Sequence, residues 1–448
     1  MDKIAKFLPF LAWIHEIKDK NVLKADLVAG LTVALVLVPQ SMAYAQLAGL
    51  APQYGLYASF LPVMIAALMG SSRQLGTGPV AVVSLLTAAA IPTIIPDGAD
   101  MVTYAAYASL LAFLVGIFQF ALGALKLGFV INFLSHPVVV GFTNAAAIII
   151  GTSQLSKVFG VDKGVGEHTY EQVWGVLANA SQHTHAWTLF AAVVAFAIMI
   201  GVKKYAPKLP GVLLAVVVTT VISWAMSFGM PVADGGLGGA IVGSIPEGLP
   251  ALTVPNFDFS IINQMIVTAI TIGLIGFMEA ISIAKAMAAQ TKQRLNADQE
   301  LMGQGLSNVV SSFFQGYAVS GSFSRSAVNI SAGAVTGFSS VVTAVIVGIT
   351  LLWLTPLLYH LPQATLAAVI IMAVINLIKF KPILHAWKVE KHDAIVAVTA
   401  FVLTILFAPH LENGIVIGVI LSLGLFLFRT MEPRFTELST HDGSTMFM

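Results

Sequence analysis

The sequence lacks cysteine and is poor in charge. With no cysteine among its 448 residues, it can form neither disulfide bonds nor thiolate metal sites. Only 10% of the residues are charged, whereas soluble domains carry about 25%. Hydrophobic residues make up 57% and the mean hydropathy is +0.89, so most of the chain is expected to lie in a lipid bilayer. The net charge of +1 provides no overall field that would attract nucleic acid.

About fourteen hydrophobic segments emerge when a spanning length of about 20 residues is the guide. They predict an all-α membrane protein with fourteen transmembrane segments. Two of them, 79–95 and 323–334, are short and begin at glycine or serine, which predicts half-helices at spans three and ten. Residues 1–20 are basic and amphipathic and are expected to form a helix on the membrane surface. The predicted spans are 27–47, 54–70, 79–95, 101–125, 135–155, 186–202, 210–228, 261–281, 298–313, 323–334, 336–353, 362–378, 393–409 and 413–429.

The distribution of lysine and arginine predicts which side of the membrane each loop occupies. Five lysines precede the first span, and the positive-inside rule places that end in the cytoplasm. With an even number of spans, both termini are expected there, including a cytoplasmic tail at 431–448. Of the 22 Lys and Arg, all but Lys157, Lys163 and Arg325 then fall in predicted inner segments. The predicted outer segment 229–260 contains neither lysine nor arginine.

That Gly- and Pro-rich outer segment divides the chain into two halves of seven spans, 1–228 and 261–430. An odd number of spans per half places the halves in opposite orientations. Each half has a polar residue in its first span, Gln40 or Glu279, followed roughly 40 residues later by a small-residue turn that opens a short helix, as inverted repeats do. This order of features favours an inverted repeat over a chance similarity of two apolar sequences.

A helix that begins inside the bilayer exposes unpaired backbone N–H groups, which together with the helix dipole form a positive pole. The Gly78-Pro79 pair suits such a start because proline tolerates the first helical turn. Ser322, Ser324 or Ser326 is expected to cap the second half-helix. Two opposed poles predict an anion-binding site between them.

Arg325 is the only charged residue between Leu301 and Ile378. A charge at the bilayer centre costs about 2.5–3.5 kcal/mol on insertion scales, so an intramembrane arginine calls for a functional or structural reason. One interpretation is that Arg325 supplies positive potential to a substrate. The other is that it bonds backbone carbonyls where the helix is broken. The two roles are compatible, since the field acts without direct contact.

Glu279 ends an uncharged stretch that begins at Phe259. A carboxyl group buried among apolar helices tends to be neutral, so Glu279 is a candidate proton carrier; the alternative is an interfacial glutamate paired with Lys285. Gln40 offers an amide beside the helix-breaking Pro39, and Tyr44 lies four residues on, along the same helix face. No metal-ligand spacing, nucleophile–base set or phosphate loop stands out, so neither an enzyme nor a cofactor is expected.

The run PQSMAYAQLAGLAPQYGLYASFLPVMIAALMGSSRQLGTGPVAVVSLL, residues 39–86, resembles the sulfate permease (SulP) family, in particular through P-x-Y-G-L-Y-A-S followed by G-S-S-R. The segments FLSHPVVVGFTNAAAIIIGTSQL and GSFSRSAVN are also similar to that family. The resemblance implies fourteen spans in two inverted repeats, a core at about 27–125 and 261–353, and a gate at about 135–228 and 362–429. It also implies a homodimer in a bacterial inner (plasma) membrane. The family usually carries a STAS domain after the last span. About 19 residues follow Arg429 here, so either the chain was cut or the protein lacks that domain.

Family members bind an anion between half-spans three and ten. Glu279 matches an acidic position linked to cation coupling in that family. The residues that the resemblance implies as substrate contacts are Gln40 and Tyr44 in span one, Val80 and Ala81 after the Gly-Pro turn, and Ser324 and Arg325 in span ten.

These features predict a secondary active transporter of small anions that works by an elevator motion of the core. Sulfate is the leading substrate, with a dicarboxylate or bicarbonate as alternatives, and H⁺ or Na⁺ is the expected coupling ion. Two other functions stay open. One is a nucleobase–proton symporter of the same architecture; the other is a passive anion channel or exchanger, or a voltage-responsive motor. The expected partners are the anion, the cation, lipid and a second copy of the chain.

Overall fold

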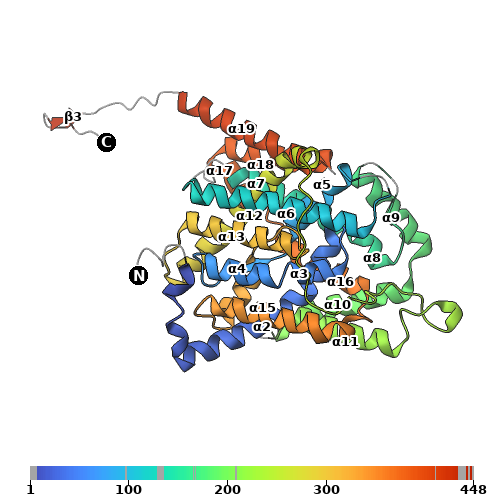
Figure 1. Ribbon diagram of the computed structural model, residues 1–448. Coiled ribbons are helices and arrows are strands. Elements are labelled where there is room, and N and C mark those ends of the chain that lie inside the picture. Colours follow the sequence, from blue (N-terminus) through green and yellow to red (C-terminus); the bar gives the residue numbers. More distant parts are fainter. Residues whose placement is uncertain are drawn as a thin grey trace.

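The computed structural model describes residues 8–95, 98–128, 136–164, 166, 168–206, 209–408, 410–431, 440–441 and 444–445. Within them the chain is built almost entirely of helices, most of which run roughly along one direction (Figure 1). The predicted all-α fold class is therefore confirmed. The predicted tail at 431–448 lies largely outside the described residues.

Each of the fourteen predicted hydrophobic segments contains helix. In the first half the helices are α2 (Lys20–Leu47), α3 (Pro52–Tyr57), α4 (Leu61–Met69), α5 (Ala81–Ala90), α6 (Met101–Ala124), α7 (His136–Ser153), α10 (Ala186–Tyr205) and α11 (Gly211–Ala225). In the second half they are α12 (Phe259–Thr291), α13 (Ala297–Phe313), α14 (Phe323–Ser331), α15 (Phe338–Ile349), α16 (Gln363–Ile375), α18 (Lys391–Phe407) and α19 (Leu411–Met431).

The structure also contains helices that the hydrophobic pattern does not predict, namely α8 (Leu155–Phe159), α9 (Thr169–His183) and α17 (Lys381–Val389). Seven helical stretches of the described chain are long and apolar enough to cross a membrane, and three of them join consecutive elements, such as α3 with α4 in Pro52–Met69. The other helices are shorter or more polar, so the count of fourteen spans stays a prediction. Large apolar side chains nevertheless cover the outside of the protein, such as Trp224 at 65% and Trp353 at 67% exposed. Such a surface suits lipid rather than water.

The N-terminal segment differs from the predicted surface helix. Its described part consists of two short 3₁₀ turns, η1 (Pro9–Ala12) and η2 (Glu16–Lys18). Asp19 caps α2 by accepting the N–H of Asn21 at 2.8 Å, so the first long helix already begins at Lys20. Trp13 is buried and Glu16 forms an ion pair with Arg73 at 2.9 Å. The segment is therefore held against the protein.

The helices pack in two groups. In one group α13 lies along α6 and α4, α15 along α2 and α4, and α12 along α6. In the other, α18 packs on α7 and α19, and α10 on α11 and α16. The groups meet where α2 contacts α16 and α11 and where α5 contacts α7. They include the helices expected for the core and the gate, respectively; that these groups move as two bodies stays a prediction.

Glycines allow a close helix contact in the first group. A Cβ atom on Gly116 of α6 would lie 2.6 Å from the backbone nitrogen of Val309 in α13 and 2.7 Å from the carbonyl oxygen of Gly305. Both distances are shorter than any real Cβ contact, so the backbones of α6 and α13 approach each other only because Gly116 lacks a side chain. Small residues at such contacts are typical of membrane helix packing.

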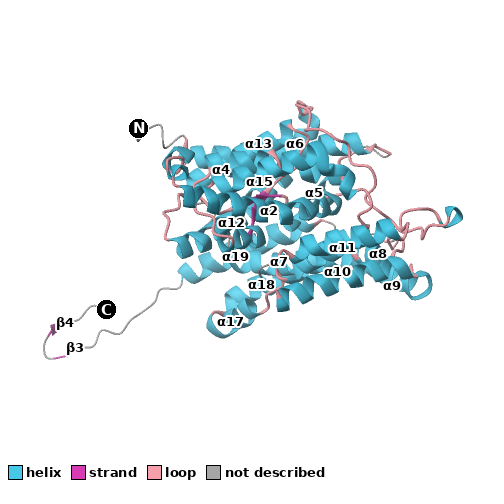
Figure 2. Cartoon of the chain, turned by 90° about the horizontal axis from the view of Figure 1, so that it is seen from below, coloured by secondary structure: helices cyan, strands magenta, loops and turns pink. Residues whose placement is uncertain are grey.

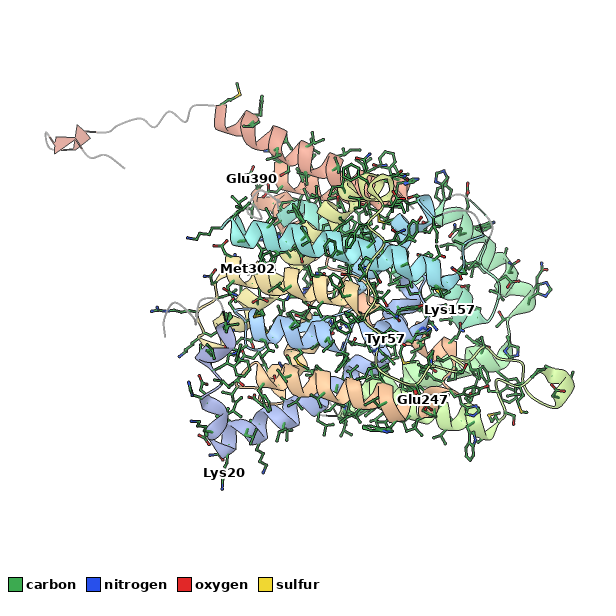
Figure 3. All side chains as sticks on the ribbon, in the orientation of Figure 1. Lys20, Tyr57, Lys157, Glu247, Met302 and Glu390 are labelled. Atoms are coloured by element: carbon green, nitrogen blue, oxygen red, sulfur yellow. The ribbon has the colours of Figure 1, made fainter. Side chains whose placement is uncertain are left out.

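The loops fall at two opposite ends of the molecule. Figure 3 places Lys20, Met302 and Glu390 toward one end, and Lys157 and Glu247 toward the other. Residues 229–258, coloured yellow-green in Figure 1, lie at this second end, opposite the start of α2 and the end of α19. This arrangement agrees with the predicted order of inner and outer loops. Which end faces the cytoplasm stays a prediction.

Candidate anion site at the two broken helices

Two strands of three residues each form the centre of the candidate site. Strand β1 (Gly76–Gly78) pairs with β2 (Ser320–Ser322) in antiparallel register, with Gly76 opposite Ser322 and Gly78 opposite Ser320. All six residues are buried, and Figure 2 shows the short ribbon among the surrounding helices. It joins segments that lie more than 200 positions apart in the sequence.

The strand pair sets the directions of the two predicted half-helices. In an antiparallel pair the carboxyl ends of the strands lie at opposite ends of the ribbon. Helix α5 begins at Ala81, just beyond β1, and α14 begins at Phe323, directly after β2. The two helices therefore run away from the ribbon in opposite directions, each with its N-terminus toward it. Both positive poles are thus directed at the same region.

Two details of the predicted helix starts need correction. Pro79 precedes α5 instead of occupying its first turn, because the strand pairing extends to Gly78 and Val80 is the N-cap residue. Ser322 is the N-cap residue of α14, but its side chain makes no capping hydrogen bond. Its Oγ lies 3.2 Å from Oγ of Ser324 instead. The first backbone N–H groups of both helices therefore receive no side-chain cap.

Glycine is required on β1. Gly78 has φ +141°, a conformation that residues with a side chain rarely adopt. A Cβ atom on Gly76 would lie 2.8 Å from Cβ of Arg325. The glycines thus allow α14 to approach β1 closely.

Arg325 is the largest fully buried side chain among the described residues, with 0% exposure. Its Nη1 donates a hydrogen bond to the carbonyl oxygen of Pro79 at 2.8 Å, while Nε and Nη2 have no partner in the described part of the chain. Ser326 adds a second link to β1, because its Oγ accepts the N–H of Gly76 at 2.8 Å. Arg325 therefore bonds a backbone carbonyl, as the structural interpretation expects. It also retains positive charge and two unused donors at the ribbon, as the functional one expects.

Helix α2 places the other predicted contact residues. It packs against both α5 and α14. Gln40 and Tyr44 on α2 are buried, and Oε1 of Gln40 has no partner within the described residues. Tyr44 belongs to the same buried cluster as Val80 and Ala81. Of the predicted set, Ser324 is exposed.

Glu279 lies on α12, which packs directly on β2. Oγ of Ser320 donates to the carbonyl oxygen of Gly276 at 2.6 Å, one turn before Glu279. Oε2 of Glu279 is buried and has no hydrogen-bond partner within the described residues. Neither Lys285 nor Arg325 forms an ion pair with Glu279 within 4.0 Å among the described residues. The expected alternative, a pair with Lys285, is thus not formed.

The structure adds residues that the sequence analysis did not select. Tyr317 is buried, and its hydroxyl lies 3.0 Å from Oγ of Ser84 on α5, which ties the approach to β2 to the first half-helix. Gln304 and Asn308 on α13 bond to the two strand regions. The unusual number of polar residues in span nine is the signal that would have identified α13.

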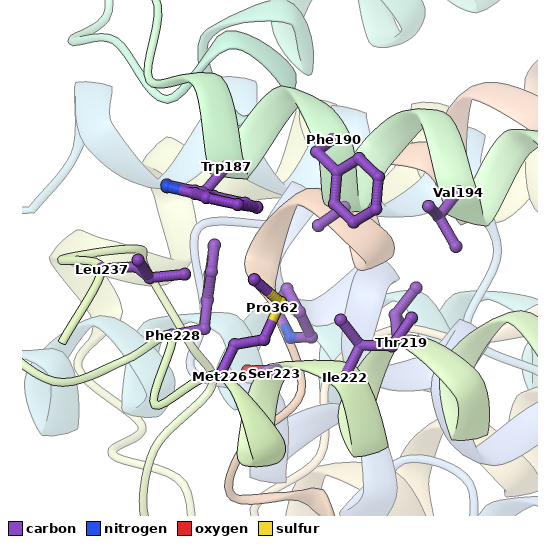
Figure 4. A pocket seen from close by; sticks show the side chains of 11 residues that line it. Trp187, Phe190, Val194, Thr219, Ile222, Ser223, Met226, Phe228, Leu237 and Pro362 are labelled. Carbon is purple, nitrogen blue, oxygen red and sulfur yellow. The ribbon is translucent and has the colours of Figure 1, made fainter.

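Two hollows lie away from the ribbon. One, between α10 and α11, is lined mainly by apolar side chains such as Trp187, Phe190 and Met226 (Figure 4). The other is a cleft of about 1050 Å³ next to the N-terminal segment, and Arg73, Lys126, Lys292 and Arg294 are among its lining residues. Neither contains a predicted contact residue. The described residues include no cluster of three or more His, Asp or Glu that would hold a metal ion.

The model of the sulfate permease family matches residues 23–400 of this sequence. The chain belongs to the sulfate permease family. The match includes both strands, both half-helices and every predicted contact residue. It confirms the resemblance that the motifs at residues 39–86 indicate.

Individual members of the family are similar over nearly the whole chain. A probable sulfate transporter 4.2 of Arabidopsis thaliana is 37% identical over 456 residues, which cover 100% of this chain and 65% of the relative. A sodium-independent sulfate anion transporter of Bos taurus is 33% identical, covering 97% of this chain and 74% of the relative. The chain thus spans about two thirds of the length of the plant protein.

Two solved structures share the fold. The structure of SLC26A9 superimposes with a TM-score of 0.87 at 27% identity, covering 96% of this chain and 69% of that one. The transmembrane domain of the cyanobacterial bicarbonate transporter BicA gives a TM-score of 0.75 at 26% identity, covering 91% of this chain and 98% of that one. The family and the fold are therefore both shown.

Proposed function

We propose that this protein is a secondary active transporter of small anions, and that the anion binds at the ends of α5 and α14 beside the β1–β2 ribbon. One observation carries the proposal: the N-termini of both half-helices are directed at the ribbon, where the guanidinium of Arg325 is completely buried. Helix N-termini bind anions through unpaired N–H groups, and the arginine adds a full positive charge.

The site suits an anion that must bind and then leave. In the described structure the guanidinium of Arg325 is enclosed by protein and holds the carbonyl of Pro79. It therefore acts on an anion through its field, while the uncapped N–H groups of α5 and α14 provide the contacts. Such donors hold a dehydrated anion without a direct ion pair. Gln40 and Tyr44 from α2, together with Val80, Ala81 and Ser324, are the proposed surrounding contacts.

Sulfate is the proposed main substrate, with a dicarboxylate or bicarbonate as alternatives. The names of the plant and bovine relatives support sulfate, and the name of BicA supports bicarbonate. A neutral nucleobase needs no buried arginine beside its site. Arg325 therefore disfavours the nucleobase symporter.

Glu279 is the proposed coupling residue, for H⁺ or Na⁺. Asp26 and Glu300 are the fully buried carboxylates of the described chain. Both accept hydrogen bonds from neighbouring groups of the protein. Asp26 accepts from the N–H of Val335 at 2.8 Å and from Thr336. Hydrogen-bond donors of the protein therefore already occupy both carboxylates. Oε2 of Glu279, in contrast, has no hydrogen-bond partner among the described residues and is available for a cation.

The proposed transport cycle is an elevator motion, in which the core group of helices carries the site past the gate group. The supporting observations are the two packing groups and their limited contact through α2 and α5. The proposal includes fourteen spans in two inverted repeats of seven, with both termini in the cytoplasm of a bacterial cell. It also includes a homodimer in the inner membrane.

Uptake into liposomes tests the function. Purified protein is reconstituted, and labelled sulfate uptake is measured under an imposed proton or sodium gradient, with fumarate, bicarbonate and uracil as competitors. Saturable uptake that anions inhibit and one gradient drives is the expected result. Uracil transport would establish the nucleobase function instead, and an unsaturable conductance without cation dependence would establish a channel.

A further inference from the structure

Helix α13 carries a buried row of polar side chains on one face. Glu300, Gln304, Ser307, Asn308 and Ser311 are each at most 1% exposed. Apart from the adjacent Ser307 and Asn308, they follow one another at three or four residues, which places them along one side of the helix. Polar groups are costly inside a membrane and mark functional positions. None of these residues belongs to the proposed contact set, so their role needs a separate explanation.

Asn308 holds the chain that leads into β2. Its Oδ1 accepts the N–H of Val319 at 2.7 Å and its Nδ2 donates to the carbonyl oxygen of Val319 at 3.2 Å. Both backbone groups of the residue immediately before β2 are therefore fixed by one side chain. Nδ2 also donates to Oε1 of Gln119 on α6 at 3.0 Å, which orients the amide.

Gln304 holds β1 from the next turn of the same helix. Its Nε2 donates to Oγ1 of Thr77, the central residue of β1, at 2.9 Å, and to Oε1 of Glu300 at 3.3 Å. Glu300 in turn accepts the N–H groups of Ser71 and Ser72, both at 2.9 Å. The same face of α13 therefore fixes β1 and the turn that leads to it.

We propose that Gln304 and Asn308 are positioning residues of the anion site, each holding one strand so that the two half-helix N-termini keep their relative placement. The proposal rests on the proposed function. Each strand has only three residues, and short glycine-rich strands have weakly specified register. A displacement of about 1 Å in the groups that hold a substrate can lower activity greatly. Anchoring both strands to one rigid helix prevents such a slip without contact with the anion.

The test compares the KM for sulfate with the maximal uptake rate per folded protein. Gln304→Met removes the bonds to Thr77 and Glu300 with little change in volume, and Thr77→Val removes only the bond between Thr77 and Gln304. Each is expected to raise KM about threefold to tenfold, the effect of one lost hydrogen bond, at an unchanged maximal rate. The KM of the double variant is expected to be no higher than the higher KM of the two single variants, because all three variants lack the bond between residues 304 and 77.

Ser307→Ala is the matched control. Ser307 is equally buried on the same face, but its Oγ donates to the carbonyl oxygen of Pro62 on α4 at 2.7 Å and bonds to neither strand. It is expected to lower thermal stability as Gln304→Met does, with KM unchanged. An unchanged KM in Gln304→Met and Thr77→Val, or an equal rise in Ser307→Ala, overturns the positioning role. Absence of anion uptake by the unmodified protein would instead overturn the proposed function, and this inference with it. If Gln304→Met does not fold, Thr77→Val decides, because it leaves α13 intact.

Discussion

Arg325 on α14 donates from Nη1 to the carbonyl oxygen of Pro79, 246 positions earlier in the chain, at 2.8 Å. This bond ties the second half-helix to the residue that follows β1. The side chain of Arg325 thus has two roles, which different substitutions can separate. It joins α14 to the chain that follows β1, and it places a buried positive charge beside β1.

Arg325→Ala is expected to abolish high-affinity anion uptake. It removes the charge and leaves the buried carbonyl of Pro79 without its donor, and the loss of a charged hydrogen bond costs about 1.5–3 kcal/mol, or tenfold and more in affinity. Arg325→Lys keeps the charge, and if the field matters, it is expected to recover part of the affinity. The KM for sulfate in liposomes is the measurement. Equal affinities for the Ala and Lys variants, both below wild type, would assign Arg325 a purely structural role.

Glu279→Gln is expected to abolish uptake driven by a cation gradient while anion exchange across the membrane continues. The amide has nearly the same shape as the carboxyl group but can neither carry a proton nor neutralise a sodium ion. The measurement compares accumulation against a gradient with exchange of labelled for unlabelled sulfate in the same vesicles. Glu300→Gln is the contrasting variant, because that carboxylate only accepts bonds from the turn before β1 and from Gln304. Full accumulation by Glu279→Gln would exclude the coupling role.

The helices and the isolated charged residues could be predicted from the sequence, because long apolar runs and single charges within them are local features. Arg325 and Glu279 stand out in stretches that contain no other charge. The β1–β2 ribbon could not be predicted, since each strand has three residues and the pairing joins Gly76 to Ser322 far along the chain. The shift of the start of α5 from Pro79 to Ala81 has the same cause. The amphipathic helix α9 lacks the continuous apolar run that marks the predicted spans.

Gly78→Ala is expected to impair transport more than its effect on stability explains. At φ +141° the added methyl group strains the backbone, and it would also lie 3.3 Å from Nη2 of Arg325. Gly333→Ala is the matched control, since Gly333 has φ +95° but nothing within 4 Å of its added Cβ. Each variant should lose about 1 kcal/mol or more of stability from strain. The KM for sulfate should rise only for Gly78→Ala; similar values for the two variants would show that contact at β1 is unimportant.

The ion pair between Glu16 and Arg73 is expected to contribute little to stability. Its side chains are 38% and 29% exposed, respectively, and exposed pairs typically contribute about 0–1 kcal/mol. Glu16→Gln should therefore shift the thermal unfolding midpoint slightly, and the shift should shrink at high salt because salt screens exposed charges. Trp13→Ala should destabilise far more, since it empties a buried site. A large, salt-independent effect of Glu16→Gln would contradict this ranking.

The absence of cysteine makes the membrane topology directly testable. Single cysteines in place of Glu247 and Lys388, both exposed, can be labelled with a thiol reagent that does not cross membranes, and the unmodified protein provides a background without thiols. Because lysine-rich loops stay in the cytoplasm, Glu247→Cys is expected to react in intact cells, and Lys388→Cys only after the membrane is permeabilised. Detergent-solubilised protein controls for reactivity, since both variants should be labelled there. Labelling of both positions from the same side in intact cells would contradict an odd number of spans between them and, with it, the proposed orientation of the two halves.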